Sequence, residues 1–67
     1  MNFDLVLSIG SLVRTISSTK HRGALGIVVE TRPRWIDPYE EELLVTVLYP
    51  DTGEELSWSD RDLEVVQ

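Results

Sequence analysis

The sequence of 67 residues contains no cysteine and a single histidine, His21. It therefore has neither disulfides nor thiolate metal ligands, and one histidine cannot make a structural zinc site. A domain of this size buries only about 60% of the surface that its unfolded chain exposes. We therefore expect no metal and no cofactor, and a stability that comes from a well-packed core, from self-association or from a larger assembly.

Long apolar runs are also missing, since no stretch approaches the roughly 18 residues that a membrane-spanning helix needs. Residues 1–5 contain an early acid, Asp4, and no basic side chain, which is not the pattern of a secretory signal. We expect a complete gene product of one domain, without a membrane partner, that acts in the cytoplasm or in a particle assembled there.

The chain does contain five short β-type runs separated by glycine-bearing turns. They are too close together to leave room for a crossover helix, so the strands must pair antiparallel and the sheet must curl on itself. The polar residues 59–62 predict one helical turn before the last run. The sequence therefore predicts an all-β fold, a small SH3-like barrel over residues 9–67. The five expected strands are residues 12–16, 26–31, 43–49, 54–59 and 63–66.

Alternation of apolar and polar residues within these strands predicts the core. The expected core residues are Leu12, Val13, Ile16, Ile27, Val29, Val45, Val47, Leu56, Trp58, Leu63 and Val66. Residues 32–42 contain Pro33 and Pro38 and are predicted to be an exposed loop, because proline fixes φ and removes a backbone donor. A loop of this length in so small a domain is expected to be functional or to be held in place by its aromatic residues.

Residues 1–8 form an N-terminal arm in which apolar and polar residues largely alternate. Such alternation predicts a strand, which pairs either with the edge of the barrel or with a neighbouring copy. An apolar strand of this kind left free would be an association hazard. The candidate self-association residues are Phe3, Leu5 and Leu7.

Charge is unevenly distributed along the chain, whose net charge is −6. Residues 1–36 hold five basic and two acidic side chains, a net charge of +3, whereas residues 37–67 hold one basic and ten acidic side chains, a net charge of −9. A dipolar surface of this kind favours head-to-tail self-association or a partner of mixed charge. The overall acidity argues against nonspecific coating of DNA, where contacts to phosphates dominate the affinity.

Two segments combine basic and aromatic residues and supply the candidate partner-binding residues. If both segments lie at the same end of the barrel, a positive rim with a stacking indole could hold a nucleic-acid strand or an acidic peptide. The alternative is that both segments are solvated and that Trp35 closes the open end of the barrel. The residues are Lys20, His21, Arg22, Arg32, Arg34, Trp35 and Tyr39.

Two further patterns are weaker. Trp35, Tyr39 and Trp58 have the composition of an aromatic groove for proline-rich peptides, but the aromatic and acidic pattern that signalling SH3 domains carry early in the chain is missing. Gly23 and Gly26 have the spacing of a nucleic-acid-clamping loop, but the second glycine runs straight into a strand, which indicates a bend or bulge instead.

No catalytic residue is expected. The chain has no cysteine nucleophile, and His21 lies in a polar segment without an obvious acid to orient it. Asp51, Glu54 and Glu55 surround Gly53, but their spacing is not that of a calcium loop, so they are interpreted as a solvated hairpin tip. We therefore expect neither an enzyme nor a small-molecule substrate.

Several segments together form a frame that resembles a known family. They are residues 10–14 (GSLVR), 23–30 (GALGIVVE), 45–49 (VTVLY) and 62–66 (DLEVV), together with Trp58. Over roughly residues 9–66 the frame is similar to that of small SH3-like, KOW-like barrel proteins, especially short proteins of tailed bacteriophages, including phages of cyanobacteria. Two departures weaken a transfer of nucleic-acid binding: Tyr49 stands where tryptophan is frequent, and residues 32–42 are longer and more acidic than in a minimal KOW unit.

The resemblance implies the barrel fold and a noncatalytic role, and fold alone does not carry a function. The leading hypothesis is a structural or protein-interaction module, an accessory component of a phage particle, located in the host cytoplasm or in the virion. Its partner is another protein or a second copy. Two alternatives stay open: a KOW-type protein that binds nucleic acid or the transcription machinery, and an adaptor that binds a host peptide.

Overall fold

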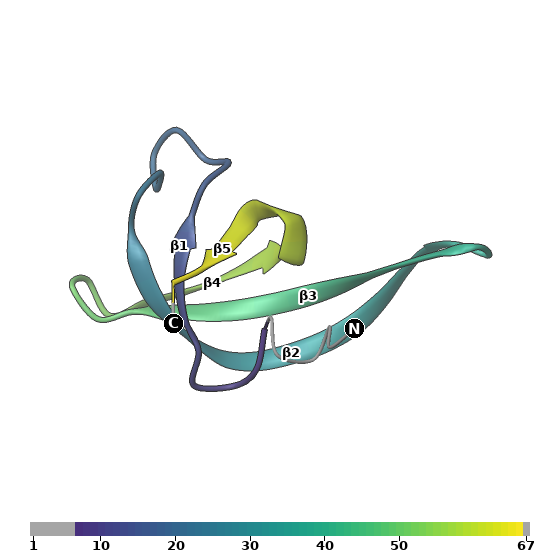
Figure 1. The fold of residues 1–67 in the computed structure, drawn as a ribbon, viewed down its shortest axis with the longest axis horizontal. Helices are drawn as coiled ribbons and strands as arrows, with labels where there is room; N and C mark the ends of the chain where they lie inside the picture. Colours follow the sequence, from purple (N-terminus) through teal and green to yellow (C-terminus); the bar gives the residue numbers. More distant parts are fainter. Residues whose placement is uncertain (1–6, 67) are drawn as a thin grey trace.

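The computed structural model describes residues 7–66, which form one antiparallel sheet of five strands. The elements in chain order are β1 (Leu12–Thr15), β2 (Leu25–Asp37), β3 (Glu40–Tyr49), β4 (Glu54–Ser59), the 3-10 turn η2 (Asp60–Asp62) and β5 (Leu63–Val65). The spatial order is β4-β3-β2-β1-β5, so β5 returns to pair with β1 and the sheet curls on itself (Figure 1). This arrangement confirms the predicted fold, an all-β, SH3-like barrel with a short helical turn before the last strand.

Most strand boundaries agree with the sequence prediction to within one residue. Strand β4 matches it, whereas β1 and β5 end one residue earlier than expected, at Thr15 and Val65. The prediction of an exposed loop over residues 32–42 is wrong. Strand β2 continues to Asp37 and β3 begins at Glu40, so that only Pro38 and Tyr39 form the turn between them.

Strand β2 tolerates a proline in its second half because of the way the sheet is paired there. Strand β1 pairs with residues 25–27 of β2 only, whereas β3 follows β2 to its end, with Pro33 opposite Leu43. Among the described residues, this part of β2 therefore has a neighbour on one side alone. A proline at a sheet edge removes no ladder hydrogen bond that the second side would need.

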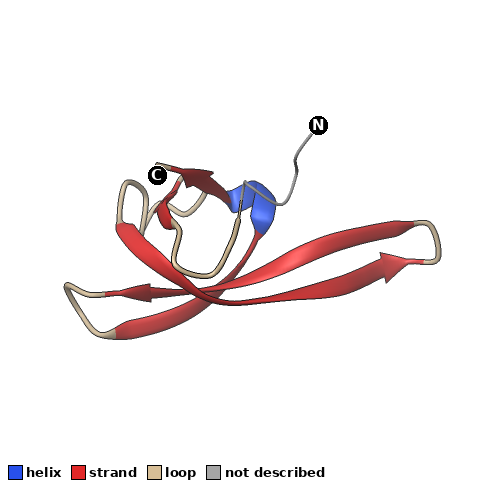
Figure 2. Ribbon diagram, turned by 60° about the horizontal axis from the view of Figure 1, so that its bottom comes forward, coloured by secondary structure: helices blue, strands red, loops and turns tan. Residues whose placement is uncertain are grey.

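The same pairing produces a two-stranded hairpin arm, residues 33–43. Strand β4 pairs with β3 from Leu44 to Tyr49, so within residues 7–66 no third strand reaches the arm. Figures 1 and 2 show it extending well beyond the other strands, and the principal extents of the molecule are 37 × 24 × 17 Å. The molecule is therefore a small barrel with one long projection.

The core lies between the curled faces of the sheet and is rich in valine. Its buried apolar residues are Leu7, Val13, Val28, Val45, Val47, Tyr49 and Leu63. Leu56 and Trp58 are half-buried and pack against this cluster. The burial confirms the predictions for Val13, Val45, Val47 and Leu63.

Other core predictions fail at strand ends and in β2. Ile16 and Val66 are exposed because β1 and β5 end before them. Ile27 is also exposed, because the inward face of β2 carries Gly26 and Val28 instead. A β-bulge at Val29 then changes the register of β2 against β3, and Val29, like Leu12, is only half-buried.

Gly26 marks a close approach of β2 to β3. A Cβ atom at this position would collide with the side chain of Val47 and would lie 2.8 Å from the carbonyl oxygen of Leu48. The glycine is therefore required by close backbone packing. This finding agrees with the interpretation of Gly23 and Gly26 as bend and strand residues: Gly23 has a φ of +85° at the end of the β1–β2 loop, and Gly26 lies inside β2.

A buried hydrogen bond joins β1 to β3 across the interior. Thr15 Oγ1 and Tyr49 Oη lie 2.5 Å apart, and both residues are buried. Each hydroxyl therefore has a partner, as buried polar groups require. The ring of Tyr49 therefore fills space in the core, while the hydrogen bond with Thr15 satisfies its hydroxyl group.

The N-terminal arm predicted for residues 1–8 lies mostly outside the described residues, as do Phe3 and Leu5. Leu7 belongs to the core of its own barrel and is buried there. Its side chain is therefore not presented at the surface as a contact for another copy.

Substitution of Gly26 by alanine is expected to destabilise the fold. The added methyl group has no space between β2 and β3, and overpacking of this kind costs about 1–3 kcal/mol. Urea denaturation should show a lower midpoint with an unchanged slope. The additional change Val47→Ala should make the double variant less destabilised than the sum of the two single variants; strict additivity would contradict the packing described.

Removal of the Tyr49 hydroxyl is expected to cost about 1–3 kcal/mol in Tyr49→Phe, because the Thr15 hydroxyl is left buried without its partner. The matched control is the double variant Thr15→Val with Tyr49→Phe, which removes both polar atoms. Chemical denaturation should give a coupling free energy that makes the double variant more stable than the sum of the single effects predicts. Equal effects in every background would show that the two hydroxyls do not interact.

Candidate functional site

The end of the hairpin arm presents large apolar side chains to solvent. We call residues 35–41 the hairpin tip. Within it Trp35 is 64% exposed, Ile36 is 50% exposed and Tyr39 is 95% exposed. These side chains contribute nothing to the core described above. An exposed apolar group of this kind typically marks an interaction surface.

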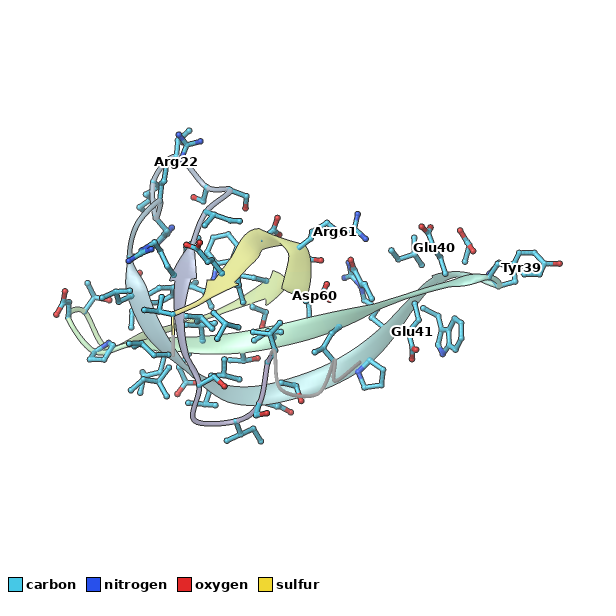
Figure 3. All side chains as sticks on the ribbon, in the orientation of Figure 1. Arg22, Tyr39, Glu40, Glu41, Asp60 and Arg61 are labelled. Carbon is cyan, nitrogen blue, oxygen red and sulfur yellow. The ribbon has the colours of Figure 1, made fainter. Side chains whose placement is uncertain are left out.

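Local chemistry explains the shape of the tip. The Oδ1 atom of Asp37 accepts a hydrogen bond of 2.8 Å from the backbone N–H of Tyr39, which closes the turn around Pro38. A second β-bulge, between Trp35 and Asp37, leaves Ile36 without a partner in the register. Tyr39 consequently lies at the far end of the arm (Figure 3).

The tip is acidic as well as apolar. Asp37, Glu40 and Glu41 are all exposed, and none of them forms an ion pair with another residue in the range 7–66. The two arginines nearby are already paired within the chain: Arg32 with Glu30, at 3.3 Å, and Arg34 with Glu42. The tip therefore offers apolar surface together with three carboxylates that form no ion pair within residues 7–66.

Glu42 anchors the arm where it leaves the barrel. Its side chain is only 6% exposed and lies opposite Arg34 in the register of β2 and β3. Arg34 Nη2 donates a hydrogen bond to Glu42 Oε2, and Ser59 Oγ at the end of β4 donates one of 3.0 Å to Glu42 Oε1. A single carboxylate therefore ties together β2, β3 and β4 at the base of the arm.

These hydrogen bonds keep Glu42 ionised. The hydrogen bond from Ser59, followed by that from Arg34, lowers the pKa of Glu42 below its ordinary value of 4.5. Burial acts in the opposite direction, and the positive charges of Arg34 and Arg61 lower the pKa further. The buried carboxylate is therefore compensated by its surroundings.

A groove lies at the other end of the barrel, between the β1–β2 loop and the β3–β4 turn. We call it the loop groove. Its volume is about 470 Å³, which is sufficient for a bulky side chain. It is lined by residues 20–24 of the loop, by Leu25 at the start of β2, by Tyr49, and by Asp51, Thr52 and Glu54 of the turn and β4.

His21 holds the β1–β2 loop against the barrel. Its ring centroid lies 5.8 Å from that of Tyr49 and 5.7 Å from that of Trp58, with an edge-on geometry at the tryptophan. Its Nε2 atom is 3.7 Å from Glu54 Oε1. The histidine thus packs between two core aromatics beside the groove and gives one wall of the groove a defined shape.

The loop groove has basic residues on the β1–β2 loop and acidic residues on the β3–β4 turn and β4. Lys20 and Arg22 on the loop are exposed, and neither forms an ion pair with a described residue. Asp51 and Glu54 lie on the opposite side, where Glu54 is close to His21. The loop side of the groove is therefore basic, and Ala24, Leu25 and Tyr49 supply apolar lining.

The structure does not bring the candidate partner-binding residues to one place. Lys20, His21 and Arg22 lie on the β1–β2 loop, whereas Arg32, Arg34, Trp35 and Tyr39 lie on β2 and the arm. Figure 3 shows Tyr39 at the end of the arm and Arg22 far from it, on the loop at the top of the barrel. The expectation that Trp35 closes the barrel is wrong, since the side chain is exposed on the arm.

The other candidate patterns are also separated in space. Trp58 lies in the barrel beside His21, so it forms no aromatic groove with Trp35 and Tyr39. Residues 7–66 contain no group of three histidine or acidic side chains placed to hold a metal ion. Their one helical element is the three-residue turn η2, so no described helix has the length to cross a membrane.

Sequence reasoning missed the anchor of the arm and the packing of His21. Opposite charges at Arg34 and Glu42 on either side of the turn are only a partial signal for the anchor, because their pairing in the register depends on the β-bulge between Trp35 and Asp37. No local signal links His21 to Tyr49 and Trp58, because the contact depends on how the loop folds back.

A scan against protein-family models and searches of curated proteins and of solved structures find no match to this chain.

The anchor predicts a defined pH dependence. Because folding holds the pKa of Glu42 below 4.5, its ionised form stabilises the folded state at neutral pH, and this contribution is lost as the pH falls below that value through the folded-state pKa. Glu42→Gln should therefore be less stable than the wild type at pH 7, and the difference should shrink as the pH falls. Urea denaturation of both proteins at a series of pH values measures it; a difference independent of pH would contradict the anchor.

Proposed function

We propose that the protein is a noncatalytic protein-interaction module and that the hairpin tip is its binding element. The observation that carries this proposal is the exposure of Trp35, Ile36 and Tyr39 at the end of the arm, where these three side chains add nothing to the core. Tryptophan and tyrosine are the residues that most often dominate the energy of protein interfaces. The three carboxylates of the tip, which form no ion pair within residues 7–66, favour a partner whose apolar pocket has a basic rim.

The construction of the arm supports the same proposal. A two-stranded hairpin is only marginally stable in water when no further strand or packed face supports it. Glu42 holds the base of the arm, whereas at the tip Trp35, Ile36 and Tyr39 are each at least half exposed. Binding to a partner buries the tip and stabilises the arm together, which explains why a small chain carries such a projection.

The setting that we propose is an accessory position in a phage particle, as the resemblance to short proteins of tailed bacteriophages implies. A nucleic-acid-binding role has less support. It needs Arg22, Arg32, Arg34 and Trp35 on one surface. Arg22 lies on the β1–β2 loop, away from the other three, and Arg32 and Arg34 on β2 are both in ion pairs. A host-peptide adaptor lacks an assembled aromatic groove.

The proposal is tested with a photo-cross-linking residue in place of Tyr39, in the full chain expressed in the cells that produce the protein. The expected result is a discrete protein adduct from position 39. The matched control carries the same residue in place of Ser57, an exposed position of β4 away from the tip. No adduct at position 39, or the same adducts at both positions, would refute the hairpin tip as the binding element.

A further inference from the structure

We propose that the partner of the hairpin tip is the loop groove of a second copy of this chain, so that copies associate head to tail. The inference rests on the function proposed above and assigns a partner to the same site. It commits to one contact: the tip, residues 35–41, of one copy seated in the loop groove of the next.

The two surfaces lie in opposite halves of the molecule. The tip is at one end of the long axis, and the β1–β2 loop that carries Arg22 projects from the barrel in the other half, at the top of the view (Figure 3). The longest extent is 37 Å, so a single copy cannot bring its own tip to its own groove. A contact between two different surfaces of identical chains is heterologous, and it either closes into a ring or continues as a filament.

The apolar parts of the two surfaces match. The tip offers Tyr39, which is 95% exposed and lies at the outermost point of the arm. The groove has a volume of about 470 Å³, and Ala24, Leu25 and Tyr49 are among its lining residues. An aromatic anchor in a preformed apolar recess is the arrangement that typically dominates the energy of a protein interface.

The charges match on the loop side of the groove. The tip carries the unpaired acids Asp37, Glu40 and Glu41, whereas the loop carries Lys20 and Arg22, which form no ion pair within residues 7–66. The opposite side of the groove holds Asp51 and Glu54, and these acids orient the tip because they repel its carboxylates. The uneven charge of the chain is thus divided between the two contact surfaces.

One tip in one groove buries less area than a standard protein interface, so the association is weak and depends on concentration. It also depends on salt, because exposed charges are screened over about 3 Å at an ionic strength of about 1 M. The measurement is sedimentation velocity of the full chain over a range of concentrations at low salt. We expect the mean mass to rise with concentration and to fall towards the monomer at high salt.

Two variants test the two contact surfaces one at a time. The tip variant carries Tyr39→Ser, Glu40→Gln and Glu41→Gln, and the groove variant carries Lys20→Glu and Arg22→Glu. All five residues are exposed, so both proteins should fold, which circular dichroism checks. Each variant alone should be monomeric, while a mixture should form a one-to-one dimer and nothing larger, because each variant keeps one intact end.

A control variant, Glu55→Gln with Val66→Ser, removes an exposed acid and an exposed apolar residue outside both surfaces and should associate like the wild type. The inference is overturned if the wild type stays monomeric at high concentration and low salt, or if the mixed variants form no dimer. A monomeric wild type whose residue 39 cross-links to a different protein would overturn the head-to-tail contact while leaving the proposed function intact. The absence of any adduct would remove the proposed function itself.

Discussion

Beyond Leu44, towards the N-terminal end of β3, the sheet loses its third strand. Strands β1 and β4 are short and cover only the barrel halves of β2 and β3. In the described part of the chain, the outer halves of β2 and β3 have only each other as partners. This difference in strand length separates a compact barrel, with its valine core, from an arm that must persist with almost no burial.

The two parts meet at one buried carboxylate. Glu42 accepts hydrogen bonds from Arg34 on β2 and from Ser59 at the end of β4, so it connects the arm to the edge of the barrel. The opposite end of the barrel is organised by packing instead, since His21 lies between Tyr49 and Trp58. The chain thus has two differently built ends, an acidic apolar projection and a recess with a basic side, and the interaction proposals follow from that polarity.

The barrel could be predicted from the sequence because turns and β-branched runs recur at short intervals, which leaves few alternatives to an antiparallel curled sheet. Which face of β2 points into the core could not be predicted, because Ile27, Val28 and Val29 are equally apolar. The inward face is set by the close contact of Gly26 with Val47. The arm was not predicted, because Pro33 and Pro38 indicated a loop. Their tendency to break strands is real, but an edge position and a turn accommodate both. The candidate site residues were recognisable by type, whereas their separation into two ends depends on the length of that hairpin.

Amide hydrogen exchange, followed residue by residue at low protein concentration, tests most directly whether the arm stands apart from the barrel. If it does, the amides of Val45 and Val47 in the barrel half of β3 exchange slowest. Those of Glu41 in the same strand and of Trp35 in β2 exchange many times faster. Equal protection along the whole length of β2 and β3 would contradict this account, because the arm would then be as firmly held as the core.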